Sequence, residues 1–304
     1  MGAISRRYKA FGSERGFVLV AVLWLLAALA ALAAIFSAFL ANSARAIAVN
    51  DNALQTEALV SAAVELTAYQ LGLSGDKRPS LGAFHTRLNG AEISVSFVAE
   101  SARIDLNHAQ KPLLAGLLTV LGAAPERAND YADRIIGWRT EGTPGAAGGE
   151  DALYRAAGLT YGPRLGPFAH VDELSLVLGL PPALVERALP YVTVFSGLNG
   201  IDAANAPPEV IAGLPGMTPL ILKQFLDDRA NLGNDAEAIK RALGSAAASA
   251  SADKCDAYRI LVRLRLRNGW QTASEVVIGL GRDEKTPYHV LAWHDGAVAR
   301  GRES

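Results

Sequence analysis

The stretch GFVLVAVLWLLAALAALAAIFSAFLA, residues 16–41, decides how this chain is built. Between Phe17 and Ala41 no residue is charged, and Ser37 is the only polar side chain. A helix rises about 1.5 Å per residue, so a helix over this stretch is long enough to cross a hydrocarbon layer about 30 Å thick. The stretch therefore predicts a membrane-spanning segment close to the amino terminus.

The residues before this segment set its orientation. Residues 1–16 carry four basic side chains and one acidic one, Glu14, so their net charge is 4 − 1 = +3. By the positive-inside rule, the amino terminus stays in the cytoplasm and the remainder of the chain is exported. The whole chain has 29 basic and 30 acidic residues, which argues against a protein that coats nucleic acid.

Three interpretations of the amino-terminal segment are open. A cleaved secretory signal peptide has a shorter apolar stretch, and only Ala41–Ala44 weakly suggests its cleavage site. A plain signal anchor fits the length and the flanking charges. The third interpretation rests on Gly16, which directly precedes the apolar stretch. This arrangement resembles the leader of a type IV prepilin, which is cut after the glycine and would leave Phe17 as the first residue. The segment alone does not separate the last two interpretations.

The helical pattern continues beyond the membrane segment. Apolar residues recur every four positions at Leu54, Ala58, Ala62 and Leu66, and neither glycine nor proline interrupts residues 17–71. We therefore predict one helix of about 55 residues, half in the membrane and half packed on a globular domain.

Strand patterns lie far apart along the chain. Residues 92–97 alternate between polar and apolar side chains, and residues 102–106 continue in the same style. Strands near the carboxyl end are expected at 259–267, 270–280 and 288–293. Asn268-Gly269 is a strong signal for a hairpin turn between the first two. The arginines on one face of the first are expected to be solvated: Arg259, Arg263, Arg265 and Arg267. An antiparallel sheet is thus built from residues distant in sequence.

Between these strands, residues 107–245 have a helical pattern. Asn107 is expected to cap a helix that ends at Leu121, and Pro125 is expected to open the next one. A glycine-rich loop follows at 142–149. Further helices are expected at 171–178, 182–194, 208–212 and 219–230. The small residues 244–252 are expected to form an exposed linker.

The fold expected from these patterns is α+β, with a long amino-terminal helix packed on an antiparallel sheet and a large inserted all-helical domain. The expected parts are a leader at 1–16, a transmembrane segment at 17–41, the rest of the helix with the first strands at 42–106, the helical insert at 107–245, and the last strands at 246–304.

Two helical stretches in the insert resemble each other. Leu113-Leu114-Ala115-Gly116-Leu117 is similar to Val210-Ile211-Ala212-Gly213-Leu214, and each follows an asparagine, Asn107 or Asn205. The second stretch continues as Pro215-Gly216-Met217-Thr218 and resembles a helix-hairpin-helix (SAM-like) unit, a fold that binds the DNA backbone. Thr218 stands where a phosphate-binding hairpin usually has a glycine, and acidic side chains outnumber basic ones over residues 172–241. We favour packing as the role of this hairpin and expect no nucleic acid as a partner. A signal-anchored exported DNA-binding protein is the alternative function.

The order of several short motifs resembles the minor pseudopilin K family of bacterial type II secretion systems. The motifs are Arg15-Gly16, Trp24 in the membrane segment, Arg103-Ile104-Asp105-Leu106-Asn107, Ile135-Ile136-Gly137-Trp138-Arg139, Gly149-Glu150-Asp151 before Tyr154, and Asp172-Glu173-Leu174 within Phe168–Val177, followed by Gly179. The resemblance implies a pilin-like sheet with a helical insert. It also implies a single-pass protein of the cell inner membrane whose carboxyl-terminal domain lies in the periplasm.

The resemblance implies a role and a set of partners. Members of the family form a pseudopilus tip complex with the minor pseudopilins I and J, above the major pseudopilin, and are thought to initiate or limit assembly during protein secretion. Prepilin peptidase is expected to cut after Gly16 and to methylate the amine of Phe17. The fifth residue of the mature chain would be Ala21, where pilins usually have glutamate. An uncharged residue there suits a subunit with no neighbour above it.

The resemblance also implies a calcium site in the loop region 138–154. Glu141, Glu150 and Asp151 supply hard oxygen ligands around this glycine-rich loop. The chain departs from the family here, because Arg139-Thr140-Glu141-Gly142 replaces a denser acidic cluster. An ordinary solvated acidic loop is the alternative. No cofactor is expected to be required, and Ca²⁺ is a possible ligand.

The sequence contains no catalytic constellation, and we do not expect an enzyme. The five histidines, His85, His108, His170, His289 and His294, lack zinc-binding spacing. Cys255 is the only cysteine and is expected to be a plain unpaired thiol. Asp105 and Asp202 each precede a helix and are expected to be caps or turn residues.

Overall fold

The computed structural model describes residues 14–142, 149–233, 235–251, 253–283 and 286–296. The chain divides into two compact units, residues 1–58 and 59–304. Helix α1 (Glu14–Leu73) is continuous over 60 residues, which confirms the prediction of one long helix. Its segment Phe17–Leu40 has a mean hydropathy of 2.9 and is exposed throughout. Among the described residues, this is the one segment long and apolar enough to span a membrane.

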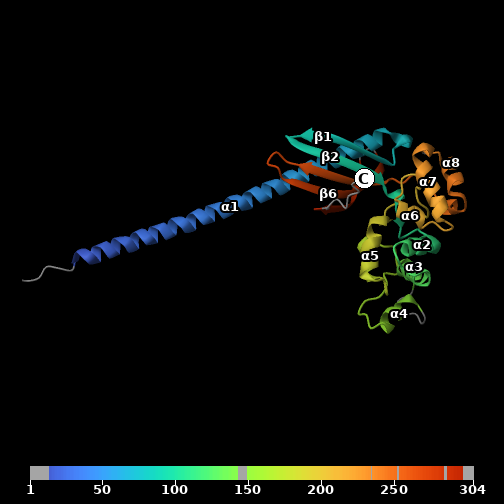
Figure 1. Cartoon of the computed structure of the whole chain (residues 1–304), viewed down its shortest axis with the longest axis horizontal. Helices are drawn as coiled ribbons and strands as arrows, with labels where there is room; N and C mark the ends of the chain where they lie inside the picture. The colour runs from blue at the N-terminus through green and yellow to red at the C-terminus, as the bar shows by residue number, and fades with distance from the viewer. Residues whose placement is uncertain (1–13, 143–148, 234, 252, 284–285, 297–304) are drawn as a thin grey trace, which may run out of the picture. The chain divides into compact units, whose positions relative to one another are not determined.

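The second unit contains an antiparallel sheet with the strand order β1-β2-β5-β6-β7 (Figure 1). The strands are β1 (Leu81–Leu88), β2 (Ala91–Ala99), β5 (Ala257–Arg265), β6 (Gln271–Asp283) and β7 (Thr286–Asp295). The last turns of α1 pack on one face of this sheet, where they bury Leu59, Val60, Val64 and Leu71. The pilin-like arrangement of a helix on an antiparallel sheet is therefore confirmed.

The alternation in the carboxyl-terminal strands is confirmed. Ile260, Val262 and Leu264 of β5 are buried against α1, and β5 returns as β6 through Asn268-Gly269, where Gly269 has a φ of 83°. A positive φ of this kind favours glycine in a tight hairpin. Strand β1, which the sequence patterns did not predict, pairs with β2 along its full length.

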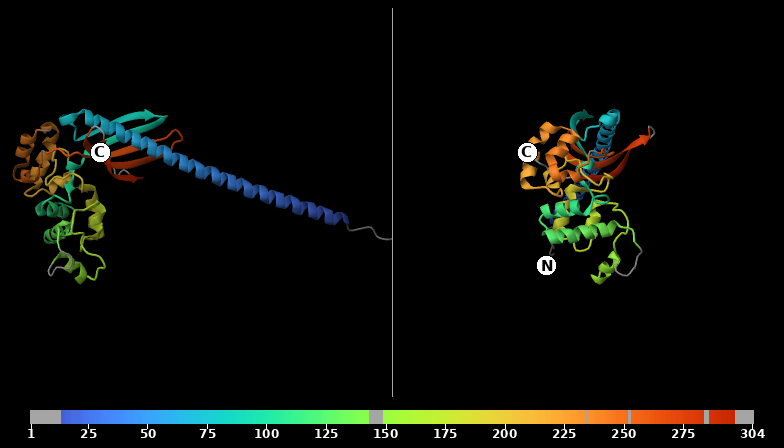
Figure 2. Two further views of the ribbon diagram at one scale, coloured as in Figure 1. Left: turned by 180° about the vertical axis from the view of Figure 1, so that it is seen from behind. Right: turned by 90° about the vertical axis from the view of Figure 1, so that its right-hand side faces the viewer.

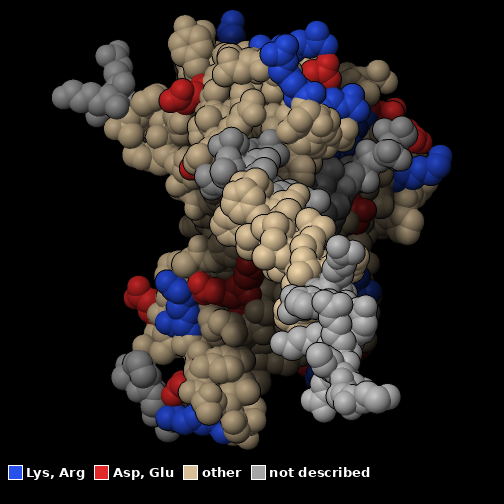
Figure 3. All heavy atoms as spheres, turned by 90° about the vertical axis from the view of Figure 1, so that its left-hand side faces the viewer, with Lys and Arg blue, Asp and Glu red and all other residues tan. Residues whose placement is uncertain are grey.

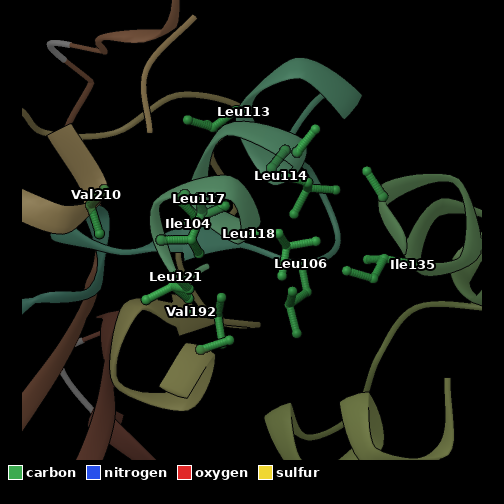
Figure 4. Packing of buried hydrophobic residues seen from close by; sticks show 14 of the residues in the cluster. Ile104, Leu106, Leu113, Leu114, Leu117, Leu118, Leu121, Ile135, Val192 and Val210 are labelled. Atoms are coloured by element: carbon green, nitrogen blue, oxygen red, sulfur yellow. The ribbon is translucent and has the colours of Figure 1, made fainter. Parts of the chain in front are cut away.

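Helices between β3 and β5 form the inserted domain (Figure 2). They are α2 (Lys111–Val120), α3 (Pro125–Arg139), α4 (Glu150–Ala156), α5 (Pro182–Ala188), α6 (Pro208–Ala212), α7 (Pro219–Leu232) and α8 (Ala236–Leu243). Short 3-10 helices are η1 (Gly75–Lys77), η2 (Glu100–Ala102), η3 (Val171–Leu176), η4 (Leu189–Tyr191) and η5 (Gly244–Ser249). Leucines on the inner side of α2 meet Leu106 and Ile135 in the core (Figure 4).

Several local predictions in the insert were wrong. Residues 102–106 do not extend the large sheet, because only Ile104–Asp105 forms a strand, β3, which pairs in parallel with β4 (Val192–Thr193). The helix expected at 182–194 ends at Ala188, because Val192 and Thr193 form β4. The stretch 244–252 is not an exposed linker. Ala246 is fully buried, and Ala250 forms a bridge with Ile201.

Asn107 does not cap a helix, because α2 begins only at Lys111 and follows Gln110. The Asn107 side chain instead makes two hydrogen bonds with the backbone of Phe168. Its Nδ2 donates to the Phe168 carbonyl at 3.0 Å, and its Oδ1 accepts from the Phe168 N–H at 2.7 Å. The sequence predicted a local contact for Asn107, but its side chain fixes a loop 61 positions away.

Candidate functional site

The expected processing junction lies at the start of α1. Gly16 is within the helix, and the side chain of Phe17 is 77% exposed. Ala21 and its neighbours are also exposed, so from Phe17 to Phe36 the helix presents an uninterrupted apolar surface. Most of the expected leader lies outside the described residues. Cleavage after Gly16 and methylation of Phe17 stay predictions.

A buried cluster of charges joins the sheet to the insert. Glu100 of η2 is fully buried, and Arg259 of β5 binds its carboxylate through Nε at 2.8 Å and through Nη2 at 3.2 Å. Arg103 adds a third contact at 3.0 Å. From the insert, the hydroxyl of Thr193 on β4 donates to the same carboxylate. One carboxylate therefore links the end of β2, the centre of the sheet and the small β3-β4 pair.

The charges in this cluster stabilise one another. Burial by itself raises the pKa of the Glu100 carboxyl, but the guanidinium groups of Arg259 and Arg103 outweigh it, so the pKa lies below its usual value. Arg259 also binds Glu275 on the neighbouring strand β6. Burial likewise opposes the charge on Arg259, yet Glu100 and Glu275 raise its pKa. The prediction that Arg259 lies on a solvated face was wrong, whereas Arg263 and Arg265 on the same strand are exposed.

Two aspartates stabilise the turns that precede α2 and α6. Asp105 is buried and accepts from the backbone N–H of Asn107 at 2.7 Å and from that of Gly197 at 2.8 Å. Asp202 accepts from the N–H of Ala204 at 3.1 Å and from the Asn205 side chain at 2.8 Å. Both are turn residues, as the sequence predicted. Asp105 additionally ties β3 to the loop after β4.

The two similar stretches of the insert pack directly against each other. A Cβ atom on Gly116 of α2 would lie 2.0 Å from the carbonyl oxygen of Gly213, which immediately follows α6. Only glycine allows this approach of two backbones. In each repeat an arginine binds the preceding turn: Arg139 of α3 donates to Ala109 at 2.6 Å, and Arg229 of α7 donates to Ala206 at 2.8 Å. The repeats therefore make equivalent contacts within one packed core.

The hairpin after α6 is engaged within the insert. The Thr218 hydroxyl accepts from the Ile221 N–H at 3.3 Å and caps α7. The Gly216 carbonyl accepts from Ser245 at 3.4 Å. These two contacts favour packing over phosphate binding as the role of the hairpin. On the face of the molecule shown in Figure 3, which is not the side of α6 and α7, basic side chains lie in small groups beside acidic ones.

Motif residues of the insert gather around one aromatic cluster. The Trp138 ring lies 6.0 Å from Phe168 and 6.1 Å from Tyr154, and its Nε1 donates to Glu173 at 3.1 Å. The fully buried Tyr154 accepts from the Leu178 N–H at 2.9 Å, and burial raises its pKa to about 12. Asn107 reaches the cluster through Phe168. Residues from four distant motifs thus serve one packing centre.

The three carboxylates expected to bind calcium do not form a site by themselves. Glu150 binds Arg134 at 2.7 Å, Asp151 binds Arg155 at 3.2 Å, and Glu141 is exposed. The described residues include no cluster of three or more side chains of metal-ligand type. Residues 143–148 of the loop lie outside the described part of the chain.

One feature does suit a cation near this loop. Atom Oε1 of Glu150 is buried and has no hydrogen-bond partner among the described residues. A Cβ on Gly137 would lie 2.7 Å from the Glu150 carboxyl, so the glycine of the α3 motif makes room for this carboxylate. Glu150 would be one ligand, and the others would have to come from backbone carbonyls of the loop. Calcium binding therefore stays a prediction.

Cys255 has the environment of a structural thiol. It is buried, its Sγ accepts from the Ala257 N–H at 3.2 Å, and burial raises the thiol pKa to about 11. Such a thiol is a poor nucleophile at neutral pH. This agrees with the expectation of a plain unpaired cysteine.

The long helix, the antiparallel sheet and the helical insert define a pilin-like protein with an inserted domain, and comparisons with known proteins point to one family. Residues 88–197 match the family model "Type II secretion system (T2SS), protein K". The type II secretion system protein K of Dickeya chrysanthemi is 31% identical over 113 residues, which make up 37% of this chain and 29% of that protein. These matches confirm the resemblance indicated by the sequence motifs.

A solved structure supports the same fold. One chain of the GspK-GspI-GspJ complex from the type 2 secretion system of enterotoxigenic Escherichia coli matches with a TM-score of 0.57 at 19% identity. The match covers 81% of this chain and 98% of that one. At this identity the likeness establishes the α+β fold with its insert.

Proposed function

We propose that this chain is a minor pseudopilin of a type II secretion system and lies at the tip of the pseudopilus. The observation that carries the proposal is the match of residues 88–197 to the protein K family model. These residues include Glu100, the aromatic cluster and the first of the two repeats, so the match covers the centre of the insert. The long apolar helix and the sheet supply the remaining parts of a pseudopilin.

The membrane helix suits the tip of a fibre. No charged residue occurs between Phe17 and Leu40, so the first turns of the mature chain would offer no carboxylate to the amine of a subunit above. An unpaired carboxylate in an apolar helix bundle would cost several kcal/mol. A subunit with nothing above it avoids this cost by having Ala21 at the fifth mature position.

The size and the rigid attachment of the insert also suit a position at the tip of the pseudopilus. It extends from β3 to β5, and the buried Glu100 cluster fixes it to the sheet. A domain of this bulk, rigidly held, would obstruct the repeated stacking of subunits inside a fibre but is compatible with the end of one. The role is mechanical: the helix joins the bundle while the head organises the tip, in support of export across the outer membrane.

The proposed partners are the minor pseudopilins I and J, with the major pseudopilin below them. The chain that matches in structure belongs to a GspK-GspI-GspJ complex, which supports the first two partners. Prepilin peptidase would remove residues 1–16, and the mature protein would be anchored in the inner membrane by one helix with its head in the periplasm. Initiating or limiting assembly is the function proposed for the resulting tip complex.

Co-purification of the full chain in detergent with tagged pseudopilins I and J of the same system tests the proposal. We expect a stable ternary complex that survives gel filtration. Loss of both partners on the column, together with salt-sensitive retention of duplex DNA, would instead favour the anchored DNA-binding alternative. A variant with Lys223→Ala on α7 serves as a control, because among the described residues this exposed side chain pairs with Asp227 of the same helix, at 3.4 Å.

A further inference from the structure

A cavity of about 430 Å³ lies within the second unit, between the large sheet and the helical insert. Its walls come from the end of η1 with the residues after it, the junction of β2 and η2, the turn before α6, α8, and the segment that leads into β5. This volume lies within the range of small-ligand sites, and segments from five parts of the chain converge on it. It lies apart from the aromatic cluster and from the loop considered for calcium.

Most of the charged side chains that line the cavity are cationic. Lys77, Lys240 and Lys254 line it together with Arg78. The Arg78 guanidinium is held by Asp256 through Nη1 at 2.7 Å, and its Nε is buried, so the lysines are the cations open to the cavity. Within the described part of the chain, Lys240 has only a long contact with Glu237, at 3.3 Å on the same helix.

The acidic residues that line the cavity are already engaged. Both carboxylate oxygens of Asp202 accept hydrogen bonds from its own turn, at 3.1 and 2.8 Å. Asp253 accepts from the Ser251 hydroxyl at 3.0 Å. Four cationic side chains line the cavity against these two carboxylates, so the lysine ammonium groups keep donors for an anion from outside.

The remaining lining of the cavity is mixed. Its polar members are Ser80, Ser101, Ser251 and Cys255, and its apolar part consists of Ala99, Ala203, Ala204, Ala236, Ile239, Ala250 and Tyr258. Small side chains of this kind accept a short aliphatic group beside the anion, whereas an inorganic ion would leave that surface uncovered.

We propose that this cavity binds a carboxylate attached to a short aliphatic chain, as found at the carboxyl terminus of an extended peptide. The ammonium groups of Lys77, Lys240 and Lys254 bind the carboxylate, and the alanine surface with Ile239 contacts the adjoining side chain. This binding does not depend on the position of the chain in a pseudopilus. In a secretion system it would give the head a place to hold the end of another polypeptide.

Calorimetry on the full chain in detergent tests the proposal with three probes: the tripeptide acetyl-Ala-Ala-Val with a free carboxylate, its carboxamide, and inorganic phosphate. We expect the free acid to bind. The affinity of the carboxamide should be lower by a factor of about ten or more, because a charge-assisted hydrogen bond is lost. Equal affinity for acid and amide, equal affinity for phosphate, or no binding of the acid would each overturn the proposal.

Variants locate the site. The double substitution Lys77→Ala, Lys254→Ala is expected to weaken binding of the free acid about tenfold or more, while Lys77→Arg, Lys254→Arg retains it. The matched control is Lys223→Ala, since Lys223 is an exposed lysine that does not line the cavity. The melting temperature of each variant without peptide shows that the fold is intact. An unchanged affinity in the alanine double variant would place the binding elsewhere and contradict the proposal.

Discussion

Glu100 and Arg259 are 159 positions apart in sequence, yet the guanidinium of Arg259 binds the buried carboxylate of Glu100 through two nitrogens, at 2.8 and 3.2 Å. The same carboxylate accepts from Thr193 in the insert. This contact decides how the insert is held against the sheet. It also gives a direct means of weakening that connection without changing the surface.

Removing the charge of Glu100 should destabilise the head. Glu100→Gln leaves Arg259 and Arg103 buried without their shared carboxylate, which costs about 3–5 kcal/mol in the free energy of unfolding. Urea denaturation of the full chain in detergent measures this. The control is Glu92→Gln on β2, whose exposed pair with Arg87 is expected to contribute about 1 kcal/mol or less. Equal effects of the two substitutions would contradict the assigned role of the cluster.

The same carboxylate makes the stability of the head dependent on pH. The pKa of Glu100 is lower in the folded chain than the usual value of 4.5. A carboxylate with a depressed pKa contributes stability that is fully present above the unfolded value and is lost as pH falls through the folded value. We expect Glu100→Gln to flatten the decline of the melting temperature below about pH 4.5. An identical acid limb in both proteins would contradict this.

The contact between Gly116 and Gly213 should not tolerate a side chain. Gly116→Ala would place Cβ 2.0 Å from the Gly213 carbonyl oxygen, so α2 and α6 must separate, at a cost of about 1–3 kcal/mol or more. Gly72→Ala is the control, because a Cβ at Gly72 in α1 meets nothing within 4 Å and alanine favours the helix. Thermal unfolding distinguishes the two. A stabilised Gly116→Ala protein would show that the repeats are packed differently.

The Asn107 side chain should matter for the position of the loop at Phe168 rather than for helix formation. Asn107→Ala removes both hydrogen bonds to the Phe168 backbone and should destabilise the chain by about 1–3 kcal/mol, with unchanged helical circular dichroism. The exposed Asn129, whose side chain donates to the Pro125 carbonyl of its own helix at 2.9 Å, provides the control Asn129→Ala. A loss of helicity in the Asn107 variant would contradict this assignment and support Asn107 as a helix cap.

Calcium should raise the melting temperature of the chain if Glu150 and loop carbonyls bind it. The comparison is millimolar calcium against chelator, in the original chain and in Glu150→Gln. We expect a rise in the first protein and none in the second. Identical melting curves in the original chain would remove the site and leave Glu150 as the partner of Arg134.

Sequence periodicity predicted those parts of the fold that depend on local pattern. The long helix, the hairpin at Asn268-Gly269 and the buried face of β5 follow from side-chain spacing alone. Strand β1 escaped prediction because its residues Leu81–Leu88 include glycine, histidine, threonine and arginine, and its pairing with β2 decides its conformation.

The roles of polar residues were harder to predict, because their partners are distant in sequence. Arg259 looks like its exposed neighbour Arg263 until Glu100 is placed beside it, and Asn107 looks like a helix cap until Phe168 is placed beside it. The repeat around Gly116 and Gly213 was visible in the sequence. What it did not show is that the two glycines contact each other.

The mass of the amino-terminal peptide, from protein purified out of its own membranes, tests the central claim that the chain is a pseudopilin. The account predicts a peptide that begins at Phe17 and carries one additional methyl group on its amine. An unprocessed amino terminus at Met1 or Gly2, in cells with active prepilin peptidase, would contradict the account and make α1 a plain membrane anchor.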